Sequence, residues 1–178
     1  YLSSAIDRDS LAFGTRSASK GNEAFAIGTR AEADGERSTA IATNATATGA
    51  NAVAFGVNAE AIGNNAFAFG TGSIARGNNA FAFGINAVAI GDDSFAFGDG
   101  ARTSSSANDS LATGENAIAR GPDSSAYGVH AHAMDFDRTY AYGTDSYAAA
   151  VDAFAYGTSS RVTATNSTAF GTNSVSRG

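Results

Sequence analysis

The sequence predicts an all-β protein, a parallel β-roll of about twelve coils of fourteen residues each. Glycine recurs every seven residues along most of the chain. Between glycines, residue types alternate with a period of two, which is typical of β-strands. Alternate seven-residue units resemble each other, so the true repeat is fourteen. Because the repeat covers nearly the whole chain, residues 1–178 are expected to form one solenoid domain.

Composition limits the possible functions. The 178 residues include 21 Gly, one Pro, no Cys and no Trp, with a net charge of -6. The negative charge argues against nucleic acid, whose phosphates require clustered Lys and Arg. The lack of Cys excludes disulfides and thiolate metal sites. No stretch is as long and apolar as a membrane span, and no signal peptide opens the chain. We therefore expect no cofactor and no membrane contact by residues 1–178, with any anchor in a region absent from them.

The repeat consists of two kinds of five-residue unit. First-type units include Ala24–Gly28 and Ala80–Gly84, and second-type units include Ala31–Gly35. Two turn-forming linker residues, such as those at 64–65, separate one unit from the next. Glycine at the fifth position suits a corner that needs a positive φ or a close backbone approach. Strands and corners in alternation predict a two-sided roll.

Two insertions shift the repeat, one of two residues around Ser106–Asp109 and one of a single residue around Phe136–Arg138. Loops that leave a rigid scaffold often carry function, although tolerated bulges are equally common. Phe136, flanked by Asp135 and Asp137, is the preferred exposed contact.

The first and third positions of each unit are predicted to face the interior. They are Ala or Ser with few exceptions, and small side chains fit the thin gap between two close sheets. If the second and fourth positions faced inward, Glu32, Asp34 and Arg76 would be buried without evident partners, which is very costly.

The outward positions of the first-type units form an aromatic stripe without charge. They hold eleven of the 12 Phe. At ~4.8 Å per coil, the stripe is roughly 55 Å long. A monomer rarely exposes so large an apolar patch, so we expect an interface between copies around a cyclic axis. The residues alone do not choose three copies over two or four. The predicted interface residues are Phe13, Phe25, Ile27, Phe55, Phe67, Phe69, Phe81, Phe83, Phe95, Phe97, Tyr127, Tyr140, Tyr142, Phe154, Tyr156 and Phe170.

The outward positions of the second-type units mix charged and apolar residues, as expected of a solvated face with apolar patches. On this face and in the insertions lie the candidate ligand contacts. These are Phe136, Arg138, Asn108, Arg76, Arg102 and Arg120.

The stretches at 65–73, 79–87 and 93–101 resemble the YadA-like head of trimeric autotransporter adhesins from Gram-negative bacteria. That family repeats Asn-Ser-Val-Ala-Ile-Gly-x-x-Ser/Ala in coils of about fourteen residues. The resemblance implies a left-handed roll, a homotrimer and a cell-surface location with an outer-membrane anchor in a region absent here. It also implies attachment to host extracellular-matrix proteins, cell-surface receptors or the same adhesin on other bacteria. Phe and Tyr replace the family's usual Val and Ile, and no neck or coiled-coil heptads are present.

Other functions are less well supported. No Ser/His/Asp arrangement is evident, so we expect no enzyme, and His130 and His132 suit solvated side chains better than a metal site. Ice binding would need regular Thr ladders, but only Thr46 and Thr48 form an outward pair. A hexapeptide acyltransferase would have a period of six. A structural spacer of a surface or phage fibre remains the alternative to an adhesin.

Overall fold

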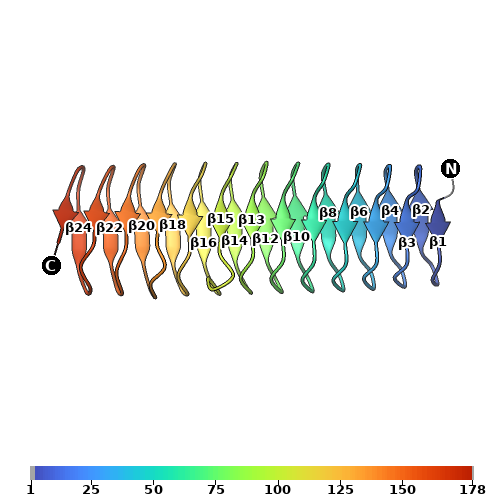
Figure 1. Ribbon diagram of the computed structural model, residues 1–178, viewed down its shortest axis with the longest axis horizontal. Coiled ribbons are helices and arrows are strands. Elements are labelled where there is room, and N and C mark those ends of the chain that lie inside the picture. The colour runs from blue at the N-terminus through green and yellow to red at the C-terminus, as the bar shows by residue number, and fades with distance from the viewer. Residues whose placement is uncertain (1–2, 178) are drawn as a thin grey trace.

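The computed structural model describes residues 3–177 and contains strands but no helix over that range. The strands form two parallel sheets of 13 and 12 strands, in which each strand pairs with the next but one along the chain. The coils stack in one direction with the termini at opposite ends (Figure 1). The predicted parallel β-roll is confirmed.

The first-type units form the 12-stranded sheet and the second-type units the 13-stranded sheet. The first sheet consists of β2 (Leu11–Phe13), β4 (Phe25–Ile27), β6 (Thr39–Ile41), β8 (Val53–Phe55), β10 (Phe67–Phe69), β12 (Phe81–Phe83), β14 (Phe95–Phe97), β16 (Leu111–Thr113), β18 (Ser125–Tyr127), β20 (Tyr140–Tyr142), β22 (Phe154–Tyr156) and β24 (Thr168–Phe170). The second consists of β1 (Ser4–Ala5), β3 (Ala18–Ser19), β5 (Glu32–Ala33), β7 (Thr46–Ala47), β9 (Glu60–Ala61), β11 (Ile74–Ala75), β13 (Val88–Ala89), β15 (Arg102–Thr103), β17 (Ile118–Ala119), β19 (His132–Ala133), β21 (Tyr147–Ala148), β23 (Arg161–Val162) and β25 (Val175–Ser176).

Strand register places equivalent residues of successive coils directly above one another. Phe67 pairs with Phe81, fourteen residues further along, and Phe81 pairs with Phe95. In this sheet the register holds across both insertions, since Phe95 pairs with Leu111 and Ser125 pairs with Tyr140. Side chains of one kind therefore form continuous ladders along the stack.

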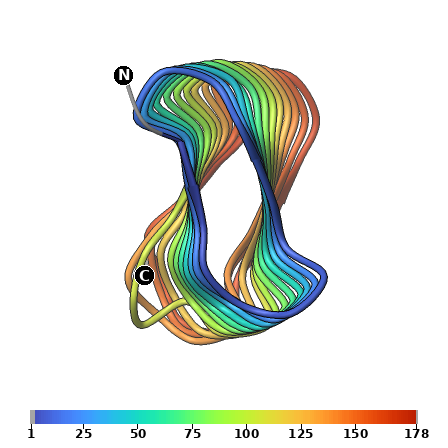
Figure 2. The same ribbon diagram turned by 90° about the vertical axis from the view of Figure 1, so that its right-hand side faces the viewer.

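The interior of the roll is made of small side chains, as predicted. Ala54 and Ala68 on one sheet and Ala61 and Ala75 on the other are almost completely buried. Viewed along the stack, the two walls lie close together at the waist and separate toward the corners (Figure 2). Among the described residues, the largest fully buried side chain is Val162. The first and third positions thus face inward, and the second and fourth face away.

The corners use glycine in both predicted ways. At Gly63 an added Cβ would lie 2.0 Å from the carbonyl oxygen of Gly77, one coil further on. Gly70 instead adopts a φ of 134°, a value that side chains rarely tolerate. The second linker residue is left-handed too, with a φ of 53° at Asn65 and at Asn79. Asn65 donates an amide hydrogen bond to Asn79 at 3.1 Å, so the corners also form ladders.

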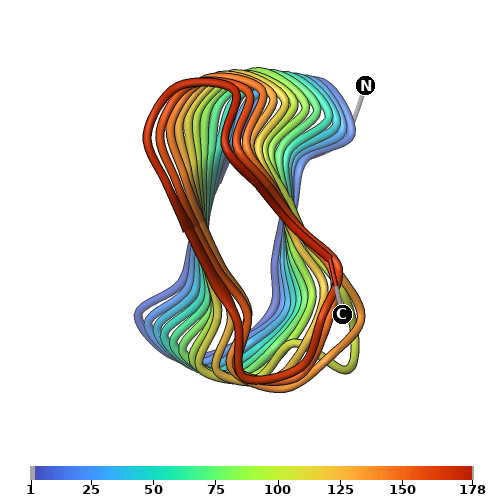
Figure 3. The same cartoon turned by 90° about the vertical axis from the view of Figure 1, so that its left-hand side faces the viewer.

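The first insertion lies slightly earlier than the sequence predicted. Asn108 and Asp109 occupy the regular linker positions, and Asp109 has the usual left-handed φ of 53°. The carbonyl of Ala107 lies beside Gly91, where a glycine carbonyl lies in the regular coils. The extra residues therefore belong to the segment 104–106, which protrudes from the outline of the roll (Figure 3). The predicted boundary was wrong because alanine replaces the glycine that marks this corner.

The second insertion also lies earlier than the sequence predicted, again because another residue replaces the glycine at the corner. Phe136 takes the glycine position, with its carbonyl beside Gly121. Asp137 and Arg138 then form a regular linker, with Arg138 at a φ of 51°. The extra residue is Asp135, one position before the predicted segment. Both insertions thus follow strands of the 13-stranded sheet, the first directly after β15 and the second separated from β19 by one residue.

Candidate functional site

The outward surface of the 12-stranded sheet, here called the aromatic face, consists of stacked rings. The ring centroids of Phe55 and Phe69 lie 4.7 Å apart, those of Phe69 and Phe83 5.1 Å, and those of Phe83 and Phe97 5.0 Å. Phe69 nevertheless remains 43 % exposed. Stacking on neighbouring coils covers the two faces of each ring and leaves its edge in solvent.

All sixteen predicted interface residues lie on this face. Their strands contain no charged residue. Five of them are half-buried because neighbouring side chains cover more of their surface, and the others are exposed. The half-buried residues are Phe25, Ile27, Phe81, Tyr140 and Tyr142.

Three apolar residues that the sequence interpretation left unused extend the aromatic face around one corner. Val57, Ile85 and Val129 are 41 %, 51 % and 38 % exposed, each at the first linker position after a first-type unit. The signal was available, since Thr occupies this position in most other coils.

Toward the C-terminus the rings change from Phe to Tyr. The centroid separations Tyr127–Tyr142 and Tyr142–Tyr156 are both 6.2 Å. These three rings line a shallow groove of about 410 Å³. This end of the aromatic face can form hydrogen bonds through hydroxyl groups as well as apolar contacts.

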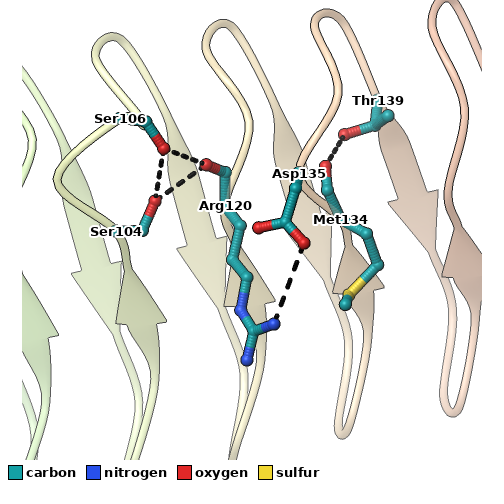
Figure 4. Close-up of polar contacts among 6 residues, drawn as sticks. All are labelled: Ser104, Ser106, Arg120, Met134, Asp135 and Thr139. Atoms are coloured by element: carbon teal, nitrogen blue, oxygen red, sulfur yellow. Dashed lines mark hydrogen bonds and ion pairs between the residues drawn. The ribbon is translucent and has the colours of Figure 1, made fainter.

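The outward surface of the 13-stranded sheet, here called the mixed face, carries the two insertions. They flank Arg120 from neighbouring coils (Figure 4). The hydroxyls of Ser104 and Ser106 donate hydrogen bonds to the Arg120 carbonyl oxygen at 2.8 and 3.1 Å. On the other side, Asp135 Oδ2 lies 3.9 Å from Arg120 Nη1. The first insertion holds the backbone of Arg120, and the second places a carboxylate near its guanidinium without a hydrogen bond.

Thr139 anchors the second insertion from inside the roll. Its buried hydroxyl donates to the Met134 carbonyl oxygen at 3.1 Å (Figure 4) and is 3.3 Å from that of Phe136. The Phe136 side chain is 46 % exposed. Thr replaces the usual Ala or Ser here because the displaced backbone offers these carbonyls.

The remaining candidate contacts have different surroundings. Arg76 Nη2 lies 3.5 Å from Glu60 Oε2. Asn108 Oδ1 accepts a hydrogen bond from the Asp92 backbone amide at 3.1 Å. Arg102 forms no ion pair with any residue in the range 3–177. The structure therefore does not gather the six candidates into one site.

Arg138 forms a bidentate ion pair with Asp152. Its Nε and Nη2 donate to the two carboxylate oxygens at 2.5 and 3.0 Å. These hydrogen bonds raise the pKa of Arg138 and lower that of Asp152. Arg138 is thereby held as part of the corner ladder.

The two histidines line a polar groove of about 330 Å³ with Tyr147 and Arg161. His130 Nδ1 lies 3.4 Å from Asp145 Oδ1. Burial lowers the pKa of His132, and the Arg120 guanidinium lowers it further. Within residues 3–177 no three His, Asp or Glu side chains are grouped as a metal site would need.

The same range holds no helix long and apolar enough to cross a membrane.

These features define a non-globular repeat protein with one apolar and one mixed face. The YadA head domain repeat model matches it over residues 5–31, 19–41, 33–59, 47–73, 59–80, 75–101, 105–131 and 148–174. The chain belongs to this family of head repeats. Family and fold are those of an adhesin head, a class that lies on the cell surface.

Among solved structures, the chain is similar to the collagen-binding domain of the Yersinia adhesin YadA. The two share 22 % identity over 65 % of this chain and 56 % of that one, with a TM-score of 0.47. The chain thus spans about half of the solved domain. No curated protein sequence matches it significantly.

Proposed function

We propose that this protein is the homotrimeric, non-catalytic head of a bacterial surface adhesin. The aromatic faces of three chains pack around the symmetry axis, and the mixed faces point outward to host extracellular-matrix proteins or cell-surface receptors. The same surface can bind copies on other bacteria. A region outside residues 1–178 anchors the head to the outer membrane.

The observation that carries this proposal is the difference between the two faces. One is uncharged along all twelve of its strands and mostly apolar, with rings such as Phe69 and Phe97 43 % and 52 % exposed in the single chain. Apolar surface of this extent favours association. The other face carries charges, grooves and both insertions, as expected of a surface that remains in solvent and varies with its partner.

Sedimentation velocity and a binding panel test the two halves of the proposal. The purified chain is expected to sediment as a trimer at micromolar concentration, and a monomer would refute the packing of the aromatic faces. Immobilised collagens, fibronectin, laminin and whole cells then test attachment. A trimer that binds none of them would favour a fibre spacer over an adhesive head.

A further inference from the structure

The mixed face contains a groove beside the first insertion. Its volume is about 270 Å³, and it spans β13, β15 and β17. The half-buried aliphatic side chains of Val88, Ile90 and Ile118 line it together with the exposed Arg102 and Arg120. Arg102 lies on the middle strand, between Val88 and Ile118. It therefore combines aliphatic side chains with two guanidinium groups.

The insertion creates this groove by interrupting a regular hydrogen-bond ladder. In the regular coils, the amide at the fourth position of a unit donates to the next coil's backbone, as Arg76 does to the Ala89 carbonyl at 2.8 Å. The Ile90 amide instead donates to the side-chain oxygen of Thr103 at 3.1 Å. The register between β13 and β15 is reduced to one residue pair, Val88 with Arg102. The chain then leaves the stack and returns.

The charges at the groove are incompletely compensated. Arg102 has no ion-pair partner within residues 3–177, whereas Arg76, one coil before Ile90, is paired with Glu60 at 3.5 Å. The only carboxylate paired with Arg120 in that range, Asp135, is 3.9 Å away and solvent-exposed. A carboxylate entering the groove would meet two donors of strong, charge-assisted hydrogen bonds.

We propose that this groove binds an extended peptide segment of the partner, in which one carboxylate side chain lies between aliphatic side chains. The assignment rests on the proposed adhesive function and specifies its partner chemistry. The carboxylate pairs with Arg102 and Arg120, and the aliphatic neighbours pack on Val88, Ile90 and Ile118.

A polyanion such as a sulfated glycan fits this surface less well. The chain has a net charge of -6, and the corner beside the groove carries the exposed carboxylates of Asp92, Asp109, Asp123 and Asp135. An extended row of negative charges would be repelled there, whereas a single carboxylate between apolar residues would touch only the two arginines.

Fluorescence anisotropy with a blocked, labelled Gly-Leu-Glu-Leu-Gly peptide tests the proposal on the full chain. The Arg102→Gln substitution is expected to weaken binding by about tenfold, the effect of losing one charge-assisted bond. Arg76→Gln, on the same face outside the groove, should change it less than about twofold. Replacing Glu by Gln in the peptide should weaken binding at least as much as Arg102→Gln does, because both arginines lose their charged partner. Three results would overturn the assignment: equal binding of the Glu and Gln peptides, no detectable binding of the Glu peptide, or an equal loss of binding in the Arg102→Gln and Arg76→Gln variants.

The same variants separate this proposal from the adhesin proposal. Sedimentation and circular dichroism first show that each remains a folded assembly. If matrix proteins bind the unmodified chain and the Arg102→Gln and Arg120→Gln variants equally, attachment stands and the groove assignment fails. If the peptide binds the groove while no matrix protein or cell binds, the groove stands and attachment fails.

Discussion

Replacing two stacked rings of the aromatic face by aspartate should dissociate the assembly without unfolding the chain. Phe69 and Phe83 are 43 % and 37 % exposed in the single chain. If each Phe side chain has a total surface of roughly 200 Å², the two rings together expose about 160 Å² that partner chains could cover. At about 25 cal/mol per Å² this amounts to about 4 kcal/mol per chain and about 12 kcal/mol for three chains. Three pairs of carboxylates near the axis would add desolvation and repulsion.

A matched pair of substitutions on the opposite face controls for the introduced charge. Ile62→Asp with Ile74→Asp makes the same change from apolar to acidic in neighbouring coils, but on the mixed face. Both double variants should keep the β-sheet circular dichroism signal, because the buried alanines are untouched. Sedimentation velocity should show monomers only for Phe69→Asp with Phe83→Asp. Trimers that survive this change, or dissociate only after the isoleucine changes, would mean that the faces are assigned the wrong way round.

Three further predictions concern stability and titration. Gly63→Ala should lower the thermal midpoint by several degrees or prevent folding, because its Cβ would lie 2.0 Å from a backbone oxygen of the next coil. Arg138→Gln should raise the pKa of Asp152 in an NMR titration. In the unmodified chain the pKa of Asp152 is lower in the folded state than in the unfolded state. The stability that ionised Asp152 contributes is therefore present above its unfolded pKa and is lost as pH falls through its folded pKa. The pKa of His132 is lowered from 6.5, first by burial and then by repulsion from Arg120. The stability that neutral His132 contributes is therefore complete above pH 6.5 and is lost as pH falls through the folded pKa. Arg120→Gln should raise this pKa in an NMR titration, and an unchanged titration would contradict the repulsion.

The fold could be predicted almost completely from the sequence because each coil repeats the same physical constraints. Alanine at Ala54 and Ala68 leaves only one direction in which the large neighbours can point. Glycine at Gly63 and Gly77 marks corners where backbones approach too closely for a side chain. Sixteen interface candidates therefore lie where expected, although their contact with partner chains stays a prediction.

The site could be predicted only in part, because the conformation of the insertions depends on local contacts and not on the fourteen-residue repeat. Ala107 and Phe136 replace the glycines that would have marked the corners, so the predicted insertion boundaries were displaced. The groove depends on one side-chain oxygen, that of Thr103, which replaces a backbone acceptor for Ile90. Arg102 and Arg120 line the same groove because β15 and β17 stay in register across the first insertion, with Arg102 opposite Ile118.

The two rows of corners differ in a way that orients each roll within the proposed trimer. The row after the first-type units carries exposed Val57, Ile85 and Val129, which continue the aromatic face, in addition to charged residues such as Asp99 and Glu115. The row after the second-type units carries polar residues and both insertions, at 104–106 and Asp135. Apolar surface is stabilised by burial and charged surface by water. In the proposed trimer we therefore expect the first row to lie next to the neighbouring chains and the second in solvent, which would leave the Arg102–Arg120 groove open.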